Sequence, residues 1–219
     1  MCGRFALYSP ATEIQRAFGI SPGELQPRYN IAPSQPLITV KLNERGGREI
    51  AHLDWGLLPA WAASRQGTYR PVINARAESA ADKPYFRAAW RQRRCLIPAD
   101  GWYEWQQTDG AKQPWYLCSA GGNVLGLAGL WEPPVGSAAH GSCAILTRPA
   151  SPELAHIHGR MPVVLAPGHW SMWLGEVPGG LGSLEAMLEG SSGREFIARR
   201  VGPRVNHPRH DGPELLEGP

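Results

Sequence analysis

A cysteine stands directly after the initiating methionine, in the run Met1-Cys2-Gly3-Arg4-Phe5. If an aminopeptidase removes Met1, which a small second residue generally permits, Cys2 carries an α-amine and a thiol on adjacent carbons. Reference pKa values of about 7.7–8.0 for the amine and about 8.5 for the thiol leave both partly nucleophilic near neutral pH. Such a 1,2-aminothiol can form a Schiff base with an aldehyde and then close through sulfur to a thiazolidine, which no internal cysteine can do. The alternative is that Cys2 is a small apolar side chain packed under the first turn.

Glu104 lies among aromatic residues, in the run Gly101-Trp102-Tyr103-Glu104-Trp105. On a strand, Trp102, Glu104 and Gln106 would share one face, so the carboxylate would point the same way as an indole ring. Contact with aromatic rings removes water from a carboxylate and raises its pKa toward the range that serves general acid–base catalysis. The alternative is a solvated glutamate on an edge strand.

Two histidines and three loop residues complete the set of side chains suited to chemistry. His156 and His158 are separated by one residue, and histidine changes charge near neutral pH, so one placed in a cleft can shuttle protons. A structural histidine with satisfied hydrogen bonds is the common alternative. Asn30, Asn74 and Arg76 can hold a sugar or a phosphate, the arginine in bidentate fashion. They can equally cap turns.

The composition is that of a globular protein without a strong charge bias. The 219 residues are 42% hydrophobic and 19% charged, which suits one large domain or two small ones. Nine Trp and 21 Pro favour a fold rich in loops and aromatic residues over a helical bundle. A net charge of only +3 does not by itself indicate nucleic-acid binding. Arginines nevertheless gather locally, at Arg91, Arg93, Arg94, Arg199, Arg200, Arg204 and Arg209.

The four cysteines indicate neither a metal site nor a disulfide framework. They are far apart, with no C-x-x-C pair and no histidine at a ligand spacing. Cys95, Cys118 and Cys143 lie in apolar, strand-like stretches, as buried free thiols do. We therefore expect no metal and no cofactor.

Turn residues divide the chain into short elements. Helices are expected at 11–18, from about 79 to 92, briefly near 152–155, and near 168–174 and 181–189. Strands are expected at 36–42, 49–57, 95–98, 102–107, 115–119, 124–131 and 142–147. Residues 21–36 and 55–67 are expected to be irregular, and the tail 201–219 extended. Regular short strands with such turns indicate a closed or strongly bent sheet within one domain, residues 1–219.

Eight segments together resemble the SOS-response-associated peptidase (SRAP) family, also called abasic-site processing proteins. Their occurrence in one order along most of the chain is not expected by chance. They are Met1-Cys2-Gly3-Arg4-Phe5, Arg28-Tyr29-Asn30-Ile31-Ala32-Pro33, Trp55-Gly56-Leu57-Leu58-Pro59, Ile73-Asn74-Ala75-Arg76-Ala77-Glu78, Ala99-Asp100-Gly101-Trp102-Tyr103-Glu104-Trp105, Gly129-Leu130-Trp131-Glu132, Ile157-His158-Gly159-Arg160-Met161-Pro162 and Val205-Asn206-His207-Pro208-Arg209.

The resemblance implies a single α+β domain, with a bent or barrel-like antiparallel sheet surrounded by helices. It implies a protein that recognises abasic sites in single-stranded DNA and crosslinks to them through the N-terminal cysteine. His156 lies outside the motif and is expected to be structural. By matching positions, Cys2 is the crosslinking nucleophile, and the other site residues are Asn30, Glu104 and His158 for catalysis and Arg4, Asn74, Arg76 and Arg160 for DNA contact.

One segment departs from the family pattern. Many relatives have two successive aromatic residues after the W-G-x-x-P segment, whereas here Trp61 is followed by Ala62. Trp61 is expected to stack on a neighbouring base. Loss of the second ring would alter the preference for strands or junctions, and the insertion Ala63–Arg70 is a candidate source of substitute contacts.

Three activities remain open from the sequence. The first is a thiazolidine crosslink, reached through Schiff-base chemistry like that of a lyase, which shields the lesion. The second is a cysteine peptidase that uses Cys2, His158 and Glu104, at least for self-removal of Met1. The third is non-covalent binding of single-stranded DNA by aromatic residues and arginines.

The expected setting follows from the resemblance and from the absence of targeting signals. The sequence shows no signal-peptide pattern at its start and no apolar run long enough to span a bilayer. We expect a cytoplasmic monomer, nucleoid-associated when bound to DNA, and no membrane partner. The expected partners are single-stranded DNA containing abasic sites and the replication or repair machinery.

Overall fold

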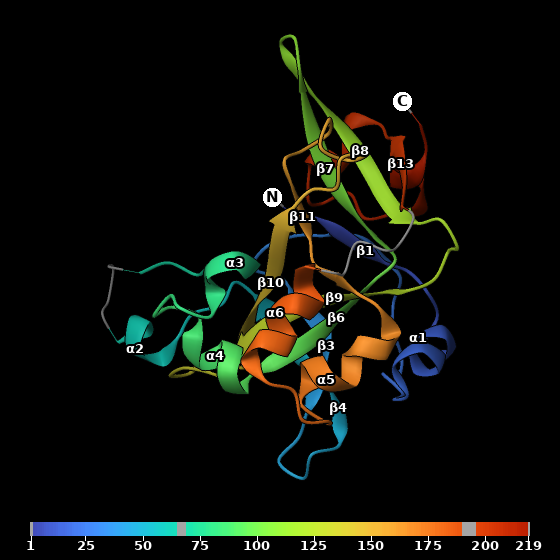
Figure 1. Ribbon diagram of the computed structural model, residues 1–219. Helices are drawn as coiled ribbons and strands as arrows, with labels where there is room; N and C mark the ends of the chain where they lie inside the picture. The colour runs from blue at the N-terminus through green and yellow to red at the C-terminus, as the bar shows by residue number, and fades with distance from the viewer. Residues whose placement is uncertain (1, 65–68, 190–195, 219) are drawn as a thin grey trace.

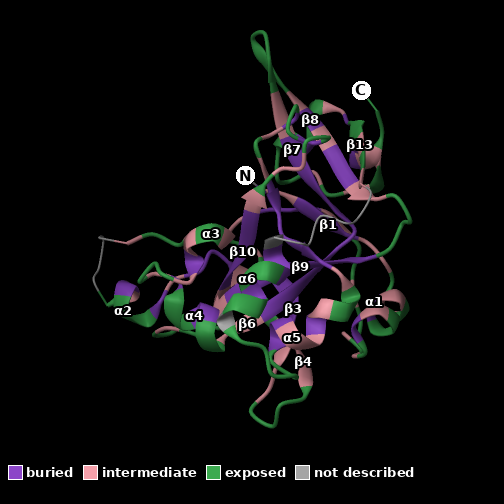
Figure 2. Cartoon of the chain, viewed as in Figure 1, coloured by how far each residue is buried: buried purple, intermediate pink, exposed green. Residues whose placement is uncertain are grey.

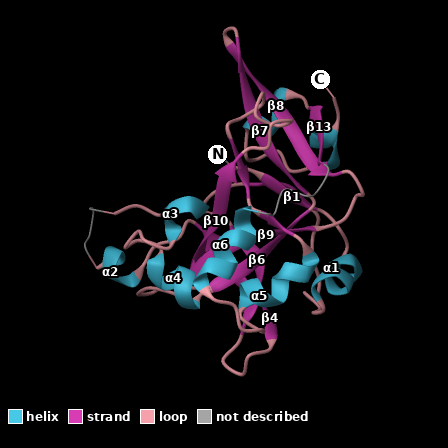
Figure 3. Ribbon diagram, in the orientation of Figure 1, coloured by secondary structure: helices cyan, strands magenta, loops and turns pink. Residues whose placement is uncertain are grey.

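The computed structural model describes residues 2–64, 69–189 and 196–218, and their arrangement is shown in Figure 1. Strands form two sheets, and helices α1 to α6 lie around the lower sheet in this view (Figure 3). The strands are β1 (Phe5–Leu7), β2 (Arg28–Ile31), β3 (Pro36–Leu42), β4 (Arg48–Trp55), β5 (Asn74–Arg76), β6 (Arg94–Ala99), β7 (Gly101–Thr108), β8 (Ala111–Ser119), β9 (Leu125–Glu132), β10 (Gly141–Pro149), β11 (Arg160–Pro162), β12 (Val164–Leu165) and β13 (Phe196–Arg200). The helices are α1 (Ala11–Phe18), α2 (Ala60–Ala63), α3 (Ala77–Ala80), α4 (Arg87–Gln92), α5 (Trp170–Leu174) and α6 (Leu181–Glu189), with 3₁₀ turns η1 (Pro167–His169), η2 (Pro203–Asn206) and η3 (Pro213–Leu216).

Strands β10, β4, β3, β6 and β9 close into a barrel. β10 pairs in parallel with β4, where Cys143 lies opposite Trp55, and antiparallel with β9, where Cys143 lies opposite Trp131. The antiparallel pairings β4–β3, β3–β6 and β6–β9 complete the ring. Buried residues run through its middle (Figure 2), including the directly paired Val40 and Leu96. The expected α+β class with a barrel-like sheet is confirmed, and the parallel pairings of β10 with β4 and β5 add to the antiparallel pattern.

The second sheet has the strand order β13-β8-β7-β1-β2 and is antiparallel throughout. β7 lies inside this sheet, between β8 and β1, so Glu104 is not on an edge strand. Gly101 begins β7 at a point of close approach, because a Cβ there would lie 2.4 Å from the carbonyl oxygen of Leu117 on β8. The sheet therefore brings the N-terminal strand against the centre of the aromatic motif.

Helix α1 follows its sequence signals. It starts after Pro10 and ends at Gly19, whose φ of 72° is the left-handed conformation that glycine adopts without cost. Ile14 and Phe18, one turn apart, are buried, and the Phe18 ring stacks on Trp170 with the ring centroids 4.3 Å apart. The expected bounds of this helix are confirmed.

Several elements differ from the sequence expectation. The helix expected from about 79 to 92 is two helices, α3 and α4, because Pro84 between them lacks an N–H and cannot continue a helix. Arg28–Ile31, expected to be irregular, forms β2 through its pairing with β1. The expected helix near 152–155 is a series of turns, the expected loop 55–67 contains α2, and the tail contains η2 and η3.

Three global features bear on function. No described helix is long and apolar enough to cross a membrane. Within the described ranges, no group of three or more His, Cys, Asp or Glu side chains could hold a metal ion. All four cysteines are free thiols, with Cys2, Cys95 and Cys143 buried and Cys118 half-buried.

Candidate functional site

A cavity of about 410 Å³ opens where the N-terminal segment meets the β7–β8 hairpin and the C-terminal segment. Four segments that are far apart in the sequence contribute to its wall, one of them the β7–β8 hairpin. The lining residues are Gly3, Arg4, Glu104, Trp105, Lys112, His158 and Asn206. Three predicted site residues, Arg4, Glu104 and His158, therefore meet at one cavity. Cys2 directly precedes Gly3, which also lines the cavity.

The backbone of Cys2 is held in place by neighbouring strands. The Tyr103 N–H donates to the carbonyl oxygen of Arg4 (2.9 Å), which continues the β1–β7 pairing and directs the preceding residues toward Glu104. Asn74, at the start of β5, donates from Nδ2 to the carbonyl oxygen of Cys2 (2.8 Å). The side chain of Cys2 is fully buried. Asn74 therefore holds the backbone of Cys2, the predicted nucleophile, in place. Met1 lies outside the described residues.

Glu104 is a buried acid beside this cysteine. Only 3% of its surface is exposed, and burial raises the pKa of its carboxyl group to about 7. Burial, and in second place the nearby Glu104 charge, raise the pKa of the Cys2 thiol well above its ordinary value. A carboxyl group with a pKa of about 7 gains and loses protons at neutral pH, as a general acid–base requires. Of the two sequence interpretations, the structure supports the desolvated carboxylate.

His158 lies next to Glu104. Its Nδ1 is 3.9 Å from Oε2 of Glu104, and the Arg160 N–H donates to the same nitrogen (3.0 Å). Burial lowers the pKa of the ring, so the neutral imidazole dominates near neutral pH. The backbone of Arg160 thus fixes the orientation of a neutral ring that faces an acid of near-neutral pKa.

Arg4 is held by the C-terminal segment. Its Nη1 donates to the carbonyl oxygen of Val205 (2.8 Å) and to Oδ1 of Asn30 (3.1 Å), and its Nη2 donates to the carbonyl oxygen of Asn206 (3.5 Å). All three acceptors are neutral groups. The guanidinium therefore keeps its positive charge at the cavity wall, in a position set by the tail.

Asn30 has a supporting position. It is fully buried, and its Nδ2 lies within hydrogen-bonding distance of the carbonyl oxygens of Val205 (3.2 Å), His207 (3.2 Å) and His210 (2.9 Å). Its Oδ1 accepts from Arg4. Asn30, predicted to be catalytic, is absent from the residues that line the cavity and ties the C-terminal segment to β2.

Arg160 and Arg76, both predicted to contact DNA, differ in their partners. Arg160 donates from Nη1 and Nη2 to the two carboxylate oxygens of Glu78 (2.5 and 3.0 Å) and from Nη2 to the carbonyl oxygen of Thr147 (2.6 Å). Its charge is neutralised in this arrangement. Arg76 is exposed and forms no ion pair with any described residue. Of these two arginines, Arg76 has its charge available to a ligand.

Trp61 is not part of the cavity wall. It is 40% exposed on α2, at the end of the molecule away from β7 in Figure 1. Its ring packs edge-on against Tyr69 (5.1 Å) and Tyr85 (6.0 Å). The insertion Ala63–Arg70 lies partly outside the described residues, so its expected substitute contacts stay a prediction.

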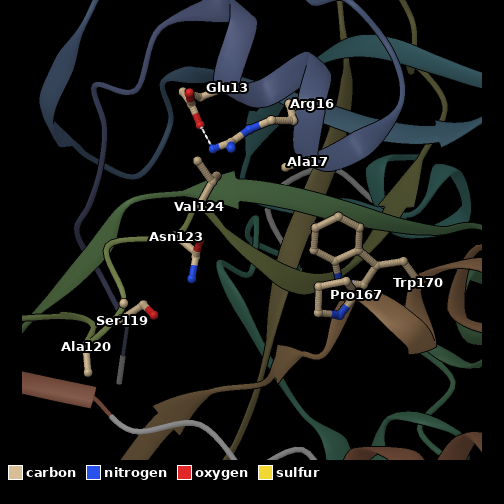
Figure 4. A pocket seen from close by; sticks show the side chains of 10 residues that line it. Glu13, Arg16, Ala17, Ser119, Ala120, Asn123, Val124, Pro167 and Trp170 are labelled. Carbon is tan, nitrogen blue, oxygen red and sulfur yellow. Dashed lines mark hydrogen bonds and ion pairs between the residues drawn. The ribbon is translucent and has the colours of Figure 1, made fainter.

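A larger cavity, of about 700 Å³, lies between α1, the β8–β9 turn and η1 (Figure 4). Its charged lining residues, Glu13 and Arg16, pair with each other across one turn of α1. None of the predicted site residues lines it. The smaller cavity is therefore the candidate active site.

Besides Gly3, sequence reasoning missed three residues that line the candidate site. Trp105 and Asn206 are bonded to each other, Nε1 donating to Oδ1 (2.6 Å), and both lie in quoted motifs without an assigned role. Lys112 reaches the cavity from β8. Its position depends on the register of the β7–β8 hairpin, in which Gln107 lies opposite Lys112, so only a hairpin prediction would have found it.

Comparisons with known proteins identify the family of the chain. The family model "SOS response associated peptidase (SRAP)" matches residues 1–208. The chain belongs to the SRAP family. It is 36% identical to "Abasic site processing protein YoqW" of Bacillus subtilis over 99% of both chains, and 32% identical to "Abasic site processing protein YedK" of Escherichia coli, again over 99% of both. "Abasic site processing protein HMCES" of Gallus gallus is 28% identical over 99% of this chain and 77% of its own length.

Solved structures share the SRAP fold seen here. A protein from Bacteroides thetaiotaomicron superposes with a TM-score of 0.82 over all of both chains, at 19% identity. A phage-related protein from Bordetella bronchiseptica has a TM-score of 0.72 at 27% identity, covering 91% of this chain and 94% of that one. The arrangement of barrel and second sheet is therefore common to proteins of widely different sequence.

Proposed function

We propose that this protein processes abasic sites in single-stranded DNA by forming a covalent crosslink to them. The supporting observation is the placement of Cys2, whose backbone is held by Asn74 and whose thiol is electrostatically coupled to Glu104. The names of the curated relatives point to the same lesion. The crosslink would shield the lesion from strand cleavage.

The chemistry starts from the aldehyde that an abasic deoxyribose exposes at C1′ when its ring opens. After removal of Met1, the Cys2 nitrogen attacks C1′ to give a carbinolamine, which loses its hydroxyl group as water and leaves an iminium ion. The Cys2 sulfur then bonds to C1′, its proton goes to a base, and the thiazolidine closes with a net loss of one water. Ring closure is intramolecular, and effective molarities for such steps reach about 10⁵–10⁸ M.

Glu104 is suited to both proton transfers. As an acid it protonates the departing hydroxyl group of the carbinolamine, and the resulting carboxylate then takes the proton of the Cys2 thiol. One proton is given and one is taken, so the residue returns to its starting state. A pKa of about 7 allows both roles at neutral pH. The same acid can protonate the ring and permit reversal.

His158 and Asn74 assist this chemistry in different ways. The neutral ring of His158, close to Glu104, relays protons and donates a hydrogen bond to the sugar oxygen. Asn74 orients the nitrogen of Cys2 through its bond to the carbonyl oxygen of that residue. Both roles need little movement of the protein during the reaction.

Positive charge binds the DNA backbone in this proposal. Arg4, Arg76 and Lys112 form no ion pair with any described carboxylate, so they can bind phosphates and affinity falls as salt rises. Arg160 contacts a phosphate only if that phosphate displaces Glu78. Trp61 stacks on a base more distant from the lesion. The protein would act as a cytoplasmic monomer, associated with the nucleoid and with replication or repair machinery when bound to DNA.

A cysteine peptidase, at least for removal of Met1, is the second candidate. Such an enzyme needs a thiolate, which a partner such as His⁺ stabilises by lowering the pKa of the thiol. Here burial and Glu104 raise the pKa of the Cys2 thiol. This electrostatic environment favours proton transfer coupled to ring closure over a resting thiolate.

A retained residue in front of Cys2 separates these functions. It blocks the α-amine and leaves the thiol, so crosslinking to an abasic oligonucleotide should vanish while DNA binding stays. Cys2→Ser keeps the amine and should give only an imine that borohydride traps, with some strand nicking. A stable adduct formed by Cys2→Ser without reductant would refute the thiazolidine step.

A further inference from the structure

Three residues line up across the second sheet, from the candidate site outward. Glu104 on β7 lies opposite Trp115 on β8, and Trp115 lies opposite Arg200 on β13. Directly opposed residues of neighbouring antiparallel strands point to the same face of a sheet. Arg200 is therefore on the face of Glu104, two strand spacings or about 10 Å away. Figure 1 shows the three strands side by side.

The exposed guanidinium of Arg200 rests on an aromatic ring. Its central carbon lies 5.4 Å from the ring centroid of the half-buried Trp115, a cation–π contact. Arg200 forms no ion pair with any residue in the described ranges. The ring limits the motion of the side chain without neutralising its charge, so an anion that binds there loses less entropy than at a free arginine.

The side chain of Trp115 is held in place by residues on the side of the candidate site. Its Nε1 donates to Oε1 of Gln106 (3.1 Å), and Nε2 of Gln106 donates to the carbonyl oxygen of His156 (3.0 Å). The ring of His156 meets the indole edge-on at 5.9 Å. These contacts connect Arg200 with the turn that carries His158. His156, expected to be structural, thus forms part of an exposed surface that continues from the site.

We propose that Arg200, supported by Trp115, binds a backbone phosphate of the DNA strand beside the abasic nucleotide. The ligand class is a phosphodiester of single-stranded DNA, and the proposal rests on the proposed function. The separation of about 10 Å from Glu104 assigns to Arg200 a phosphate next to the lesion, on the β13 side, while Arg4 and Lys112 serve the cavity itself.

Arg199 provides a matched control. It is the neighbouring residue of β13, is also exposed, and its guanidinium lies over another aromatic ring, Tyr116, at 5.2 Å. Successive residues of a strand point to opposite faces, so Arg199 is on the face away from Glu104. Arg199→Ala removes the same charge and the same type of contact from the opposite face, where the Tyr116 ring is buried and the Trp115 ring of Arg200 is half-buried.

The test compares the wild type, Arg200→Ala, Arg200→Lys and Arg199→Ala. Fluorescence anisotropy measures binding to undamaged oligothymidine over a range of salt concentrations, and gel assays measure crosslinking to the abasic oligonucleotide. Arg200→Ala should weaken binding roughly 5–20-fold and reduce the salt slope by about 0.7, the value for one phosphate contact on a single strand. Arg200→Lys should keep the slope, and Arg199→Ala should resemble the wild type. At DNA concentrations below saturation, the crosslinking rate of Arg200→Ala should fall by the same factor as its affinity.

Two outcomes would overturn this assignment. One is an unchanged affinity and salt slope in Arg200→Ala, and the other is an equal loss in Arg199→Ala, which would indicate general charge attraction. Equal melting temperatures of the variants exclude a folding effect. If the wild type forms no crosslink, the proposed function fails, whereas normal crosslinking with a silent Arg200→Ala removes only the phosphate site.

Discussion

Glu104→Gln should change how the stability of the protein depends on pH. The carboxyl group has an ordinary pKa of 4.5 and one of about 7 in the folded chain. Below both values it is protonated in the folded and unfolded states. Between them the unfolded chain releases the proton and the folded chain keeps it, so stability falls as pH rises until about 7. The difference between the two pKa values corresponds to a loss of about 3 kcal/mol in the free energy of unfolding. Glutamine is always neutral, so the variant does not show this loss.

Urea denaturation of the wild type and Glu104→Gln between about pH 4.5 and 8.5 tests this. The variant should gain stability relative to the wild type by about 3 kcal/mol over that range. Glu78→Gln, followed below pH 4.5, is the sign control, because the hydrogen bond from Arg160 lowers the pKa of Glu78 from its ordinary value of 4.5. The stability that Glu78 contributes is present above its unfolded pKa and is lost as pH falls. A difference between wild type and Glu104→Gln that does not vary with pH would refute the reasoning.

Three further substitutions test the supports of the site. Asn74→Asp keeps the size of the side chain but removes the donor to the Cys2 carbonyl oxygen. Single-turnover crosslinking should therefore slow roughly 10–100-fold, and the affinity for undamaged DNA should fall much less. An unchanged crosslinking rate would contradict the positioning role. Asn30→Ala leaves carbonyl groups of the tail unpaired and should cost about 2–3 kcal/mol of stability. Amide hydrogen exchange in residues 203–211 should become faster. Unchanged exchange in these residues would argue against the tail contact. Gly101→Ala places a Cβ 2.4 Å from the Leu117 carbonyl oxygen and should lower the melting temperature strongly, whereas a normal melting temperature would mean that β7 and β8 can separate at no cost.

Local signals in the sequence predicted much of the fold. Pro10 and Gly19 bound α1 because one fixes φ at the helix start and the other accepts the left-handed conformation at its end. The alternation of residues around Glu104 predicted β7 and a desolvated carboxylate, and both are present. The helix and the strand were predictable because short-range geometry decides them, whereas the burial of Glu104 also depends on the position of β7 between β8 and β1.

The remaining features depend on contacts between distant segments. No local sequence pattern predicts that β1 pairs with β7, or that Asn30 binds the C-terminal segment about 180 residues later in the chain. The partner of Arg160 is Glu78, brought near by the parallel pairing of β5 with β10, and that pairing has no sequence signature. Lys112 was not predicted as a site residue for the same reason, because its position depends on the pairing of β7 with β8. Motif matching identified residues of the site, but only their partners reveal which ones face the cavity.

Intact mass spectrometry of the purified protein, alone and after incubation with an abasic oligonucleotide, tests the crosslink most directly. We predict a protein that lacks Met1, and an adduct heavier by the mass of the oligonucleotide minus one water, with peptide mapping that places the bond on Cys2. An adduct on protein that retains Met1, or one bonded to any other residue, would contradict the account.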